Sequence, residues 1–274
     1  MPSAIALWRQ RVKAHHAQSI RAQGGREPSQ DFWQPLAPGF RADPHRTDDA
    51  TLDVLLRDVA PHATVLDVGG GGGRFALPLA LRCRHVTVVE PSLSMVEVLR
   101  EGIAEARIPN LTVAHSVWEQ AEVAQADVVL CTHVLYGVED VKPFVQALGA
   151  HAMDSVIMPL CMSSPQAHLA PMWQRVHGEA RVTLPGVPEL LDVLWEMGIY
   201  PDLEMLEGQS RHTYENREAA LSQLRRRVYV QADTPEDQRL HEAMSELLVE
   251  TPEGSLTWEA PLRRLGILRW RPNG

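Results

Sequence analysis

The sequence predicts an α/β protein with a doubly wound, mostly parallel sheet, helices on both faces, and helical elaborations on the N-terminal and C-terminal sides. Between residues 63 and 158, short apolar runs bounded by Gly or Pro alternate with segments of helical spacing. Five consecutive glycines, at 69–73, directly follow the first of these runs. Strands joined through helices pair in parallel, and right-handed crossovers place the helices over both faces of one sheet.

The individual elements follow from the spacing of apolar residues. Strands are expected where apolar runs are short, at 63–68, 85–90, 111–114, 126–131, 155–158, 202–206 and 265–270. Helices are expected where apolar residues recur three or four apart, at 3–22, from about 47 to Pro61, at 74–81, after a Ser92 cap, and at 141–151, 189–197, 215–229 and 235–249. Residues 24–45 are predicted to be irregular, and regularity loosens over 161–188, because Pro interrupts both stretches.

Composition indicates a globular chain in a reducing cytoplasm. The net charge of -9 counts against broad electrostatic binding of nucleic acid, which needs a basic face. No apolar run approaches the roughly 20 residues of a membrane-spanning helix, and the N-terminus is expected to be an amphipathic helix rather than a signal peptide. We expect no metal site and no disulfide, because the three cysteines form no CxxC pair and the spacing of His168 and His177 matches no zinc motif.

The glycine loop lies between a strand and a helix, with one acid before it and another about 20 residues after it. Glycines let a ligand approach the backbone, and the following helix presents N–H groups. The loop lacks the dinucleotide fingerprint, since Arg74 or Phe75 falls in its last place, and it lacks the Gly-Lys-Ser/Thr of a P-loop. Asp67 precedes the glycines, where a carboxylate would repel a pyrophosphate and attract a cation.

Asp67-x-Gly69-x-Gly71-x-Gly73 resembles the first motif of class I S-adenosylmethionine-dependent methyltransferases, over about residues 50–160. The resemblance implies S-adenosylmethionine as the cofactor, S-adenosylhomocysteine as its product, and Glu90 as the acceptor for both ribose hydroxyls. It also implies an N-terminal helix and lid segment at 1–46 and a methyltransferase domain at 47–274, with a cofactor-binding core at 47–160, an elaboration at 161–264 and a last strand at 265–271. The cofactor-binding residues that it implies are Arg46, Asp67, Val68, Gly69, Gly70, Gly71, Glu90, Pro91, Met95, Ser116, Val117, Trp118, Cys131 and Thr132.

Several of these positions have an alternative role. Met95 would lie near the adenine or in the helix core. Ser116 stands where the family often has an acid for the adenine amine, so the backbone of Val117 and the ring of Trp118 are its candidate replacements, and Trp118 would otherwise simply pack. Arg46 would bind the methionine carboxylate bidentately or remain a surface arginine.

By the same resemblance, the segment after the fourth strand would face the methionine moiety and the transferred methyl. The Cys131 carbonyl would face the ammonium, with Thr132 beside it, and His133 is the candidate general base. His133 would otherwise cap the helix or contact the cofactor. The acceptor pocket is expected to use Phe32 and Trp33 from the lid, Tyr136, and the Trp173 and His177 pair, with ordinary packing as the alternative for each aromatic residue.

Three functions are compatible with these residues. The first is methyl transfer to a small molecule by in-line displacement, without nucleic acid or membrane, by a monomer or homodimer. The second is methylation of RNA or protein, since the first 46 residues hold seven Arg or Lys against three acids, a local balance of +4. The third is a non-enzymatic S-adenosylmethionine-binding protein.

Overall fold

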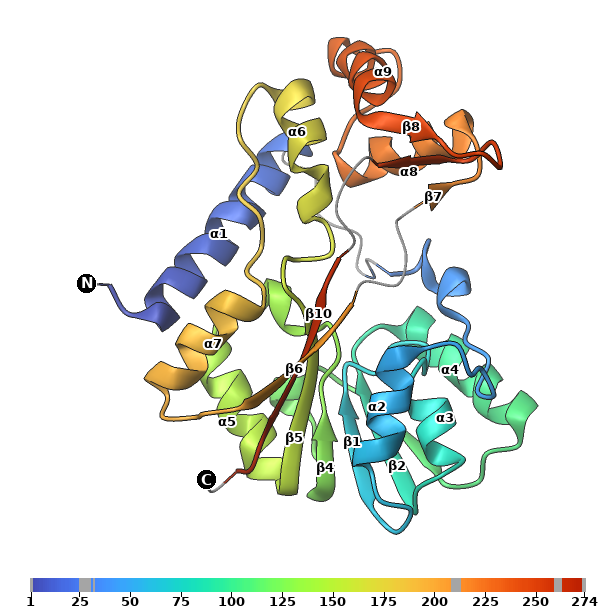
Figure 1. Ribbon diagram of the computed structural model, residues 1–274, viewed down its shortest axis with the longest axis vertical. Helices are drawn as coiled ribbons and strands as arrows, with labels where there is room; N and C mark the ends of the chain where they lie inside the picture. Colours follow the sequence, from blue (N-terminus) through green and yellow to red (C-terminus); the bar gives the residue numbers. More distant parts are fainter. Residues whose placement is uncertain (1, 25–30, 32, 208–212, 259–262, 273–274) are drawn as a thin grey trace. The chain divides into compact units, whose positions relative to one another are not determined.

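The computed structural model describes residues 2–24, 31, 33–207, 213–258 and 263–272 (Figure 1). Contacts within the chain group it into two units. The sheet unit comprises residues 28–160, 191–206 and 266–274, and the helical unit comprises residues 1–27, 161–190 and 207–265. The predicted division between residues 46 and 47 uses other boundaries and stays a prediction.

The sheet unit is built on a seven-stranded sheet with the order β3-β2-β1-β4-β5-β10-β6. Its strands are β1 (Thr64–Val68), β2 (His85–Glu90), β3 (Leu111–His115), β4 (Ala126–Leu130), β5 (Ala152–Cys161), β6 (Asp202–Leu206) and β10 (Leu265–Trp270). β1 pairs in parallel with β2 and with β4, and the β2–β3 and β4–β5 pairs are also parallel. The predicted fold class is therefore confirmed, and the strand order reverses between β1 and β4, where open parallel sheets bind ligands.

Three helices, α2 (Ala50–Asp58), α3 (Ala76–Ala80) and α4 (Leu93–Ala106), share one core with the sheet. The side chains of Leu55, Leu77 and Leu99 are almost completely buried in it. Each fully buried Leu contributes roughly 2 kcal/mol, so this core anchors the loops at the strand ends. α5 (Val141–His151) packs beside β4.

Some predicted boundaries in the sheet unit shift by a few residues. The helix expected from Thr47 begins at Ala50, because the Asp49 side chain caps it by accepting from Thr51 N and Leu52 N. The helix expected at 74–81 is only Ala76–Ala80, because the glycine loop extends to Gly73, whose φ is +86°. The cap at Ser92 is confirmed, since its hydroxyl accepts from Met95 N.

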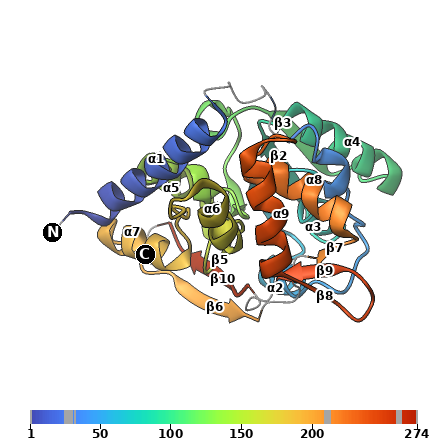
Figure 2. The ribbon, with the colours of Figure 1, turned by 90° about the horizontal axis from the view of Figure 1, so that it is seen from above.

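The helical unit contains α1 (Ala4–Ala22), α6 (Ala170–His177), α8 (Arg217–Arg227) and α9 (Pro235–Leu247). α6 lies beside α9 (Figure 2). A small antiparallel sheet has the order β7-β9-β8, with strands Thr213–Tyr214, Leu256–Trp258 and Leu248–Glu250. Neither α6 nor these three strands were predicted, because all four elements are short. α7 (Val187–Glu196) begins in the helical unit and continues in the sheet unit.

No helix within the described ranges has the length and apolar character that crossing a membrane requires.

Candidate functional site

The sheet register brings the carboxyl ends of β1, β2 and β4 to one edge. Asp67 pairs with Val88 on one side and with Leu130 on the other. The N–H of Gly69 continues the ladder by donating to the Val89 carbonyl at 2.8 Å. The glycine loop, the acid that ends β2 and the residues after β4 therefore meet at the point where the strand order reverses.

Glu90 binds the glycine loop directly. Its carboxylate accepts from Gly71 N at 2.8 Å and from Ser92 N at 2.9 Å. The residue is only 5% exposed, and burial raises the pKa of its carboxyl above the usual range although these two hydrogen bonds lower it. A carboxylate oxygen accepts more than one hydrogen bond, so Glu90 keeps capacity for the hydroxyls of a ligand.

The glycine loop leaves open space at one position. Gly71 has a φ of +54°, and a Cβ added to it would meet no atom within 4 Å. At Gly70, by contrast, an added Cβ would lie 2.8 Å from both Asp67 Oδ2 and Val88 Cγ1. The loop is thus packed closely against β1 and β2 and open at Gly71, which is where a ligand can reach the backbone.

Asp67 is a buried acid whose carboxylate is incompletely satisfied. Its Oδ1 has no hydrogen-bond partner among the described residues. Burial raises the pKa of Asp67 to about 7, and the charge of Glu90 adds to the shift. The buried hydroxyl of Thr132 likewise lacks a partner within the described part of the chain. Such groups are costly unless something pairs with them, so both are places where a ligand would gain hydrogen bonds.

The segment after β4 holds Cys131, His133 and Tyr136 at this edge. Cys131 is buried and donates from its backbone N–H to the Ile157 carbonyl. His133 has a φ of +59°, which is unusual for a residue with a side chain. Its Nδ1 lies 3.0 Å from the Tyr136 hydroxyl, and the two rings are stacked. The structure therefore pairs the candidate base with the predicted pocket tyrosine.

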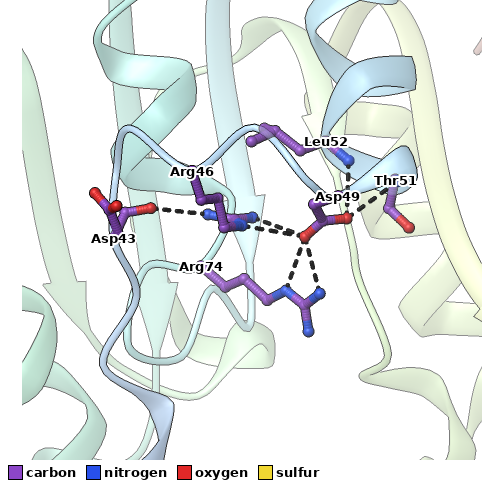
Figure 3. A network of polar contacts seen from close by, with 6 residues as sticks. All are labelled: Asp43, Arg46, Asp49, Thr51, Leu52 and Arg74. Carbon is purple, nitrogen blue, oxygen red and sulfur yellow. Dashed lines mark hydrogen bonds and ion pairs between the residues drawn. The ribbon is translucent and has the colours of Figure 1, made fainter. Parts of the chain in front are cut away.

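Arg46 takes part in a network that was not predicted from the sequence (Figure 3). Its Nε and Nη2 both donate to Asp49 Oδ2 at 3.1 Å. Arg74, directly after the glycines, donates to the same oxygen at 2.8 Å. Burial acts to raise the pKa of Asp49, but the hydrogen bonds and charge of Arg74, together with the hydrogen bonds from Leu52 N and Arg46, hold the pKa below the usual range. Two guanidinium groups thus share one carboxylate, and the network keeps one net positive charge beside the loop.

The N-terminal connection is tied to the same edge by Asp31. Its carboxylate accepts from the hydroxyls of Ser92 and Ser94 and from Ser94 N. Burial acts to raise its pKa, but these hydrogen bonds outweigh it and lower the pKa to about 2. Trp33 is 39% exposed and packs edge-on against Phe40, whereas Phe32 lies outside the described residues.

The remaining predicted cofactor residues lie along the ends of β2 and β3. Met95 is buried in α4, and the carbonyl of Pro91 lies 3.1 Å from His115 Nε2. Val117 is 42% exposed, whereas Trp118 is buried against the rings of Phe144 and His151. Val68 is a buried residue of β1, and the Ser116 hydroxyl donates to the Val117 carbonyl. The side chain of Trp118 is thus engaged with α5, and Val117 is the more accessible of the two.

Two predicted acceptor-side residues, Trp173 and His177, lie in the helical unit. Trp173 is buried, and its ring contacts His177 at a centroid distance of 4.2 Å. His177 donates from Nε2 to the Val228 carbonyl at 2.8 Å. Neither residue belongs to the sheet unit that holds the glycine loop.

Three charged residues of the site, Asp31, Asp49 and Arg74, were not predicted as functional. Asp31 follows no strand or motif, and its partners are about 60 residues away along the chain. The helix start expected near residue 47 gave Asp49 no functional role, and the nearby Arg46 was the available signal for an ion pair. Within the described residues, no group of three or more His, Cys, Asp or Glu side chains could hold a metal ion.

The residues at this edge fit S-adenosylmethionine. Its sulfonium and ammonium charges suit the buried, unpaired Asp67 oxygen, and its ribose hydroxyls suit Glu90. The open space over Gly71 would be filled by the Cβ of any other residue, and it forms the cradle in which the cofactor would lie against the backbone. The residues present therefore match the donors and charges of this cofactor.

Comparison with known proteins identifies the family. Residues 40–196, more than half of the chain, match the family described as "Methyltransferase domain", so the chain belongs to the methyltransferase domain family. The resemblance to class I S-adenosylmethionine-dependent methyltransferases is thereby confirmed. S-adenosylmethionine, the predicted cofactor, is the cofactor that this family uses.

Curated relatives cover parts of the chain. An uncharacterised protein of Haemophilus influenzae is 29% identical over 157 residues, which are 56% of this chain and 57% of that protein. A ubiquinone biosynthesis O-methyltransferase of Rickettsia felis is 28% identical over 113 residues, 39% of this chain and 46% of that enzyme. A 23S rRNA methyltransferase of Klebsiella pneumoniae is 36% identical over 94 residues, 32% of this chain and 22% of that enzyme. The chain spans about half the length of the first two of these relatives, and less of the third.

Solved structures share the fold. The YcgJ protein of Bacillus subtilis superimposes with a TM-score of 0.55 at 15% identity, over 82% of this chain and 99% of that one. A methyltransferase of Thiobacillus denitrificans, solved with S-adenosylhomocysteine, gives a TM-score of 0.50 at 14% identity, over 87% of this chain and 97% of that one. At such identities the likeness concerns the fold.

Proposed function

We propose that this chain binds S-adenosylmethionine at the glycine loop and transfers its methyl group to a small-molecule acceptor, leaving S-adenosylhomocysteine. The observation that carries the proposal is the arrangement around Gly71, where an open backbone position is hydrogen-bonded to Glu90 and follows the buried Asp67. Membership of the methyltransferase domain family supports it.

Each polar group at the edge has a proposed partner on the cofactor. Glu90 would accept from the ribose hydroxyls, and Asp67 would face the positive charge. Arg46 would bind the methionine carboxylate, which the single net positive charge of the Arg46, Asp49 and Arg74 network supports.

When bound, the cofactor supplies a methyl carbon that its positive sulfur activates for displacement. The chain's own task is to hold the acceptor in line at about 3 to 3.5 Å and to remove a proton where the acceptor carries one. His133 is the proposed base, at Nε2. For that role Nδ1 must carry the other hydrogen and donate it to the Tyr136 oxygen 3.0 Å away, so Tyr136 would be a positioning residue that fixes the tautomer.

The contact of each of the following residues with the methyl acceptor is a proposal. Trp33 and Tyr136 of the sheet unit would line the acceptor pocket. Trp173 and His177, which belong to the helical unit, and Phe32 are proposed as acceptor-side residues on sequence grounds. The state as monomer or homodimer and the cytoplasmic setting stay predictions.

The ion pairs of the N-terminal basic residues favour a small molecule over RNA. Among the described residues, at least four of the seven basic side chains in the first 46 residues pair with acids: Arg11 with Glu189, Arg21 with Glu179, Arg41 with Glu105, and Arg46 with Asp49. A paired guanidinium has less charge to offer a phosphate backbone. The likeness to a 23S rRNA methyltransferase is the observation that keeps RNA as the second candidate.

Isothermal titration calorimetry with S-adenosylmethionine and S-adenosylhomocysteine tests the first step. We expect both to bind with a Kd below about 1 mM, within the usual range for enzyme ligands. Absence of binding by both would contradict the proposal. RNA binding that weakens steeply between low and moderate salt would favour the RNA alternative instead.

Transfer of a labelled methyl group to fractionated small molecules tests the second step. His133→Ala is expected to bind cofactor as the wild type does and to transfer the label about 100-fold more slowly, as loss of a general base predicts. Tyr136→Phe keeps the ring that would line the acceptor pocket and removes only the hydroxyl, so it is expected to lower kcat and shift the pH profile of kcat while KM stays unchanged. Cofactor binding without transfer to any acceptor would support the non-enzymatic alternative.

A further inference from the structure

Asp31 is joined to the glycine loop by a chain of hydrogen bonds within the sheet unit. Its carboxylate accepts from the Ser92 hydroxyl at 2.9 Å. The backbone N–H of Ser92 donates to Glu90 Oε1 at 2.9 Å, and Glu90 Oε2 accepts from Gly71 N at 2.8 Å. Asp31 therefore reaches the open position of the loop through two intervening residues, Ser92 and Glu90.

Ser92 links the two carboxylates, and each of its polar groups has a partner. Its hydroxyl has one hydrogen, which it donates to Asp31, and the hydroxyl oxygen accepts from Met95 N at 3.2 Å. Its carbonyl accepts from Val96 N at 3.0 Å. The residue is buried, so these bonds hold its backbone in one position. The direction in which the Ser92 N–H points at Glu90 therefore depends on Asp31.

Asp31 is itself held firmly beside the first turn of α4. Ser94 donates to its Oδ2 from the backbone N–H at 3.1 Å and from the hydroxyl at 2.8 Å. The N–H of Trp33 donates to Oδ1 at 3.0 Å and orients the carboxylate from its own side of the chain. Burial acts to raise the pKa of Asp31, but these hydrogen bonds lower it to about 2, so the residue is ionised at neutral pH. A negative charge at this end of the helix also suits the helix dipole.

Glu90 needs support from Ser92 because its surroundings disfavour the charged form. Burial raises the pKa of the Glu90 carboxyl, and the charge of Asp31 adds to that rise. The hydrogen bonds from Ser92 N and Gly71 N act in the opposite direction and stabilise the carboxylate. The residue that Asp31 holds in place is thus the one that favours the ionised form of Glu90, which accepts hydrogen bonds.

The contacts of Asp31 with α4 fall into two sets. The bonds from Ser94 attach the N-terminal connection to the helix and lead no further toward the loop. The bond from Ser92 continues through Glu90 to Gly71. Attachment of the connection alone would be served by the Ser94 bonds, so the bond to Ser92 is the contact that points to a role at the proposed cofactor site.

We propose that Asp31 is a positioning residue for the cofactor, which acts through Ser92 to aim the Glu90 carboxylate at Gly71 N and at the ribose hydroxyls. The consequence for the cofactor rests on the proposed function, in which Glu90 accepts from those hydroxyls. The alignment of Glu90 on Gly71 belongs to the chain itself, so it can be measured in the protein without any cofactor.

The Gly71 N–H signal of cofactor-free protein labelled with ¹⁵N at its 18 glycines reports the position of Glu90. Gly71→Ala identifies this signal. Asp31→Asn is expected to weaken the bond to Glu90, so the signal should move upfield and its exchange with solvent should become about three- to tenfold faster. An unmoved Gly71 signal would overturn the proposal. Equal movement of all glycine signals would overturn it as well, because a general loss of structure has that effect.

Two serine variants separate the two sets of contacts. Ser92→Ala removes the hydroxyl that links Asp31 to Glu90, so it is expected to move the Gly71 signal as Asp31→Asn does. Combining these two changes should move the signal no further, because both interrupt one chain of bonds. Ser94→Ala is the matched control, which removes a bond outside that chain and should leave the signal in place. Equal shifts in the two serine variants would overturn the proposal.

Calorimetry with S-adenosylmethionine extends the test to the cofactor. Asp31→Asn is expected to raise the Kd about three- to tenfold. Glu97→Gln, which removes an exposed negative charge from α4, should change the Kd less than about twofold. A moved Gly71 signal with an unchanged Kd in Asp31→Asn would overturn the role in cofactor binding. Failure of the wild type to bind would contradict the proposed function instead, and the Gly71 signal would still decide whether Asp31 positions Glu90.

Discussion

The carboxylate of Glu90 accepts a hydrogen bond from the backbone N–H of Gly71 at 2.8 Å. The two residues are 19 positions apart, and the bond ties the loop after β1 to the end of β2. Because the same carboxylate also accepts from Ser92 N, it fixes the start of α4 as well. One side chain thus positions both the proposed cofactor cradle and the helix beside it.

Replacing Glu90 by Gln should weaken cofactor binding. The amide has one oxygen for two N–H donors, so its NH₂ group must face either Gly71 or Ser92. We expect the Kd for S-adenosylmethionine to rise at least about tenfold in calorimetry. Glu97→Gln, an exposed change on α4, is the control and should leave the Kd unchanged. An unaltered Kd in Glu90→Gln would contradict the ribose role.

Replacing Gly71 by Ala should separate binding from stability. The added methyl meets no protein atom, and the φ of +54° makes alanine cost about 1–2 kcal/mol of unfolding free energy. The methyl group occupies the proposed cradle, so cofactor affinity should fall at least about tenfold. Gly149→Ala in α5, where space is also open, should bind cofactor normally and be as stable as the wild type or more so.

The raised pKa of Asp67 predicts that cofactor binding depends on pH. A cationic ligand prefers the ionised acid, so affinity for S-adenosylmethionine should rise as pH increases through about 7. Asp67→Asn should remove this dependence. A pH-independent Kd between pH 6 and 8 in the wild type would contradict the pairing.

The same pKa predicts a loss of stability without cofactor. Since the folded pKa of about 7 lies above the ordinary 3.8, the folded protein retains a proton that the unfolded chain releases. The contribution of Asp67 to the free energy of unfolding is complete below pH 3.8. It is lost as the pH rises to about 7, and the loss amounts to up to about 4 kcal/mol. Denaturant unfolding at each pH measures the free energy of unfolding of the wild type and of Asp67→Asn. The difference between these two free energies should change between pH 3.8 and about 7.

Asp49 should be the main stabilising residue of the network beside the loop. Asp49→Ala removes the helix cap and leaves Arg46 and Arg74 without their shared acceptor, so it should cost about 2–4 kcal/mol in urea unfolding. Asp49→Asn keeps a capping oxygen and should cost less. Asp48→Asn is exposed and should change stability by less than about 0.5 kcal/mol. Equal losses in the Ala and Asn variants would show that the cap contributes nothing.

His15 should make the protein less stable in mild acid. Burial and the charge of Arg181 lower its folded pKa to about 4, below the ordinary 6.5, so the unfolded chain takes up a proton that the folded protein excludes. The contribution of His15 to the free energy of unfolding is complete above pH 6.5. It is lost as the pH falls to about 4, and the loss amounts to up to about 3 kcal/mol. His15→Gln should remove this dependence and His16→Gln should keep it, as measured by urea unfolding at each pH.

The structure brings together those predicted site residues whose signal is local in the sequence. The strand, the glycines and the helix after them are consecutive, and Glu90 ends the next strand, so parallel pairing alone brings them together. Asp31 and the partners of Asp49 were missed because side-chain bonds between distant segments leave no periodic signal in a single sequence.

The sequence by itself determined the fold class and the glycine-loop motif, because apolar periodicity, turn residues and caps act over a few neighbouring residues. Only the tertiary structure decided that Trp118 packs against α5 and that Asp31 binds the start of α4. These contacts depend on how whole elements pack, and packing selects partners by shape and charge across long stretches of chain. The position of an uncompensated charge is likewise visible only once its neighbours are known.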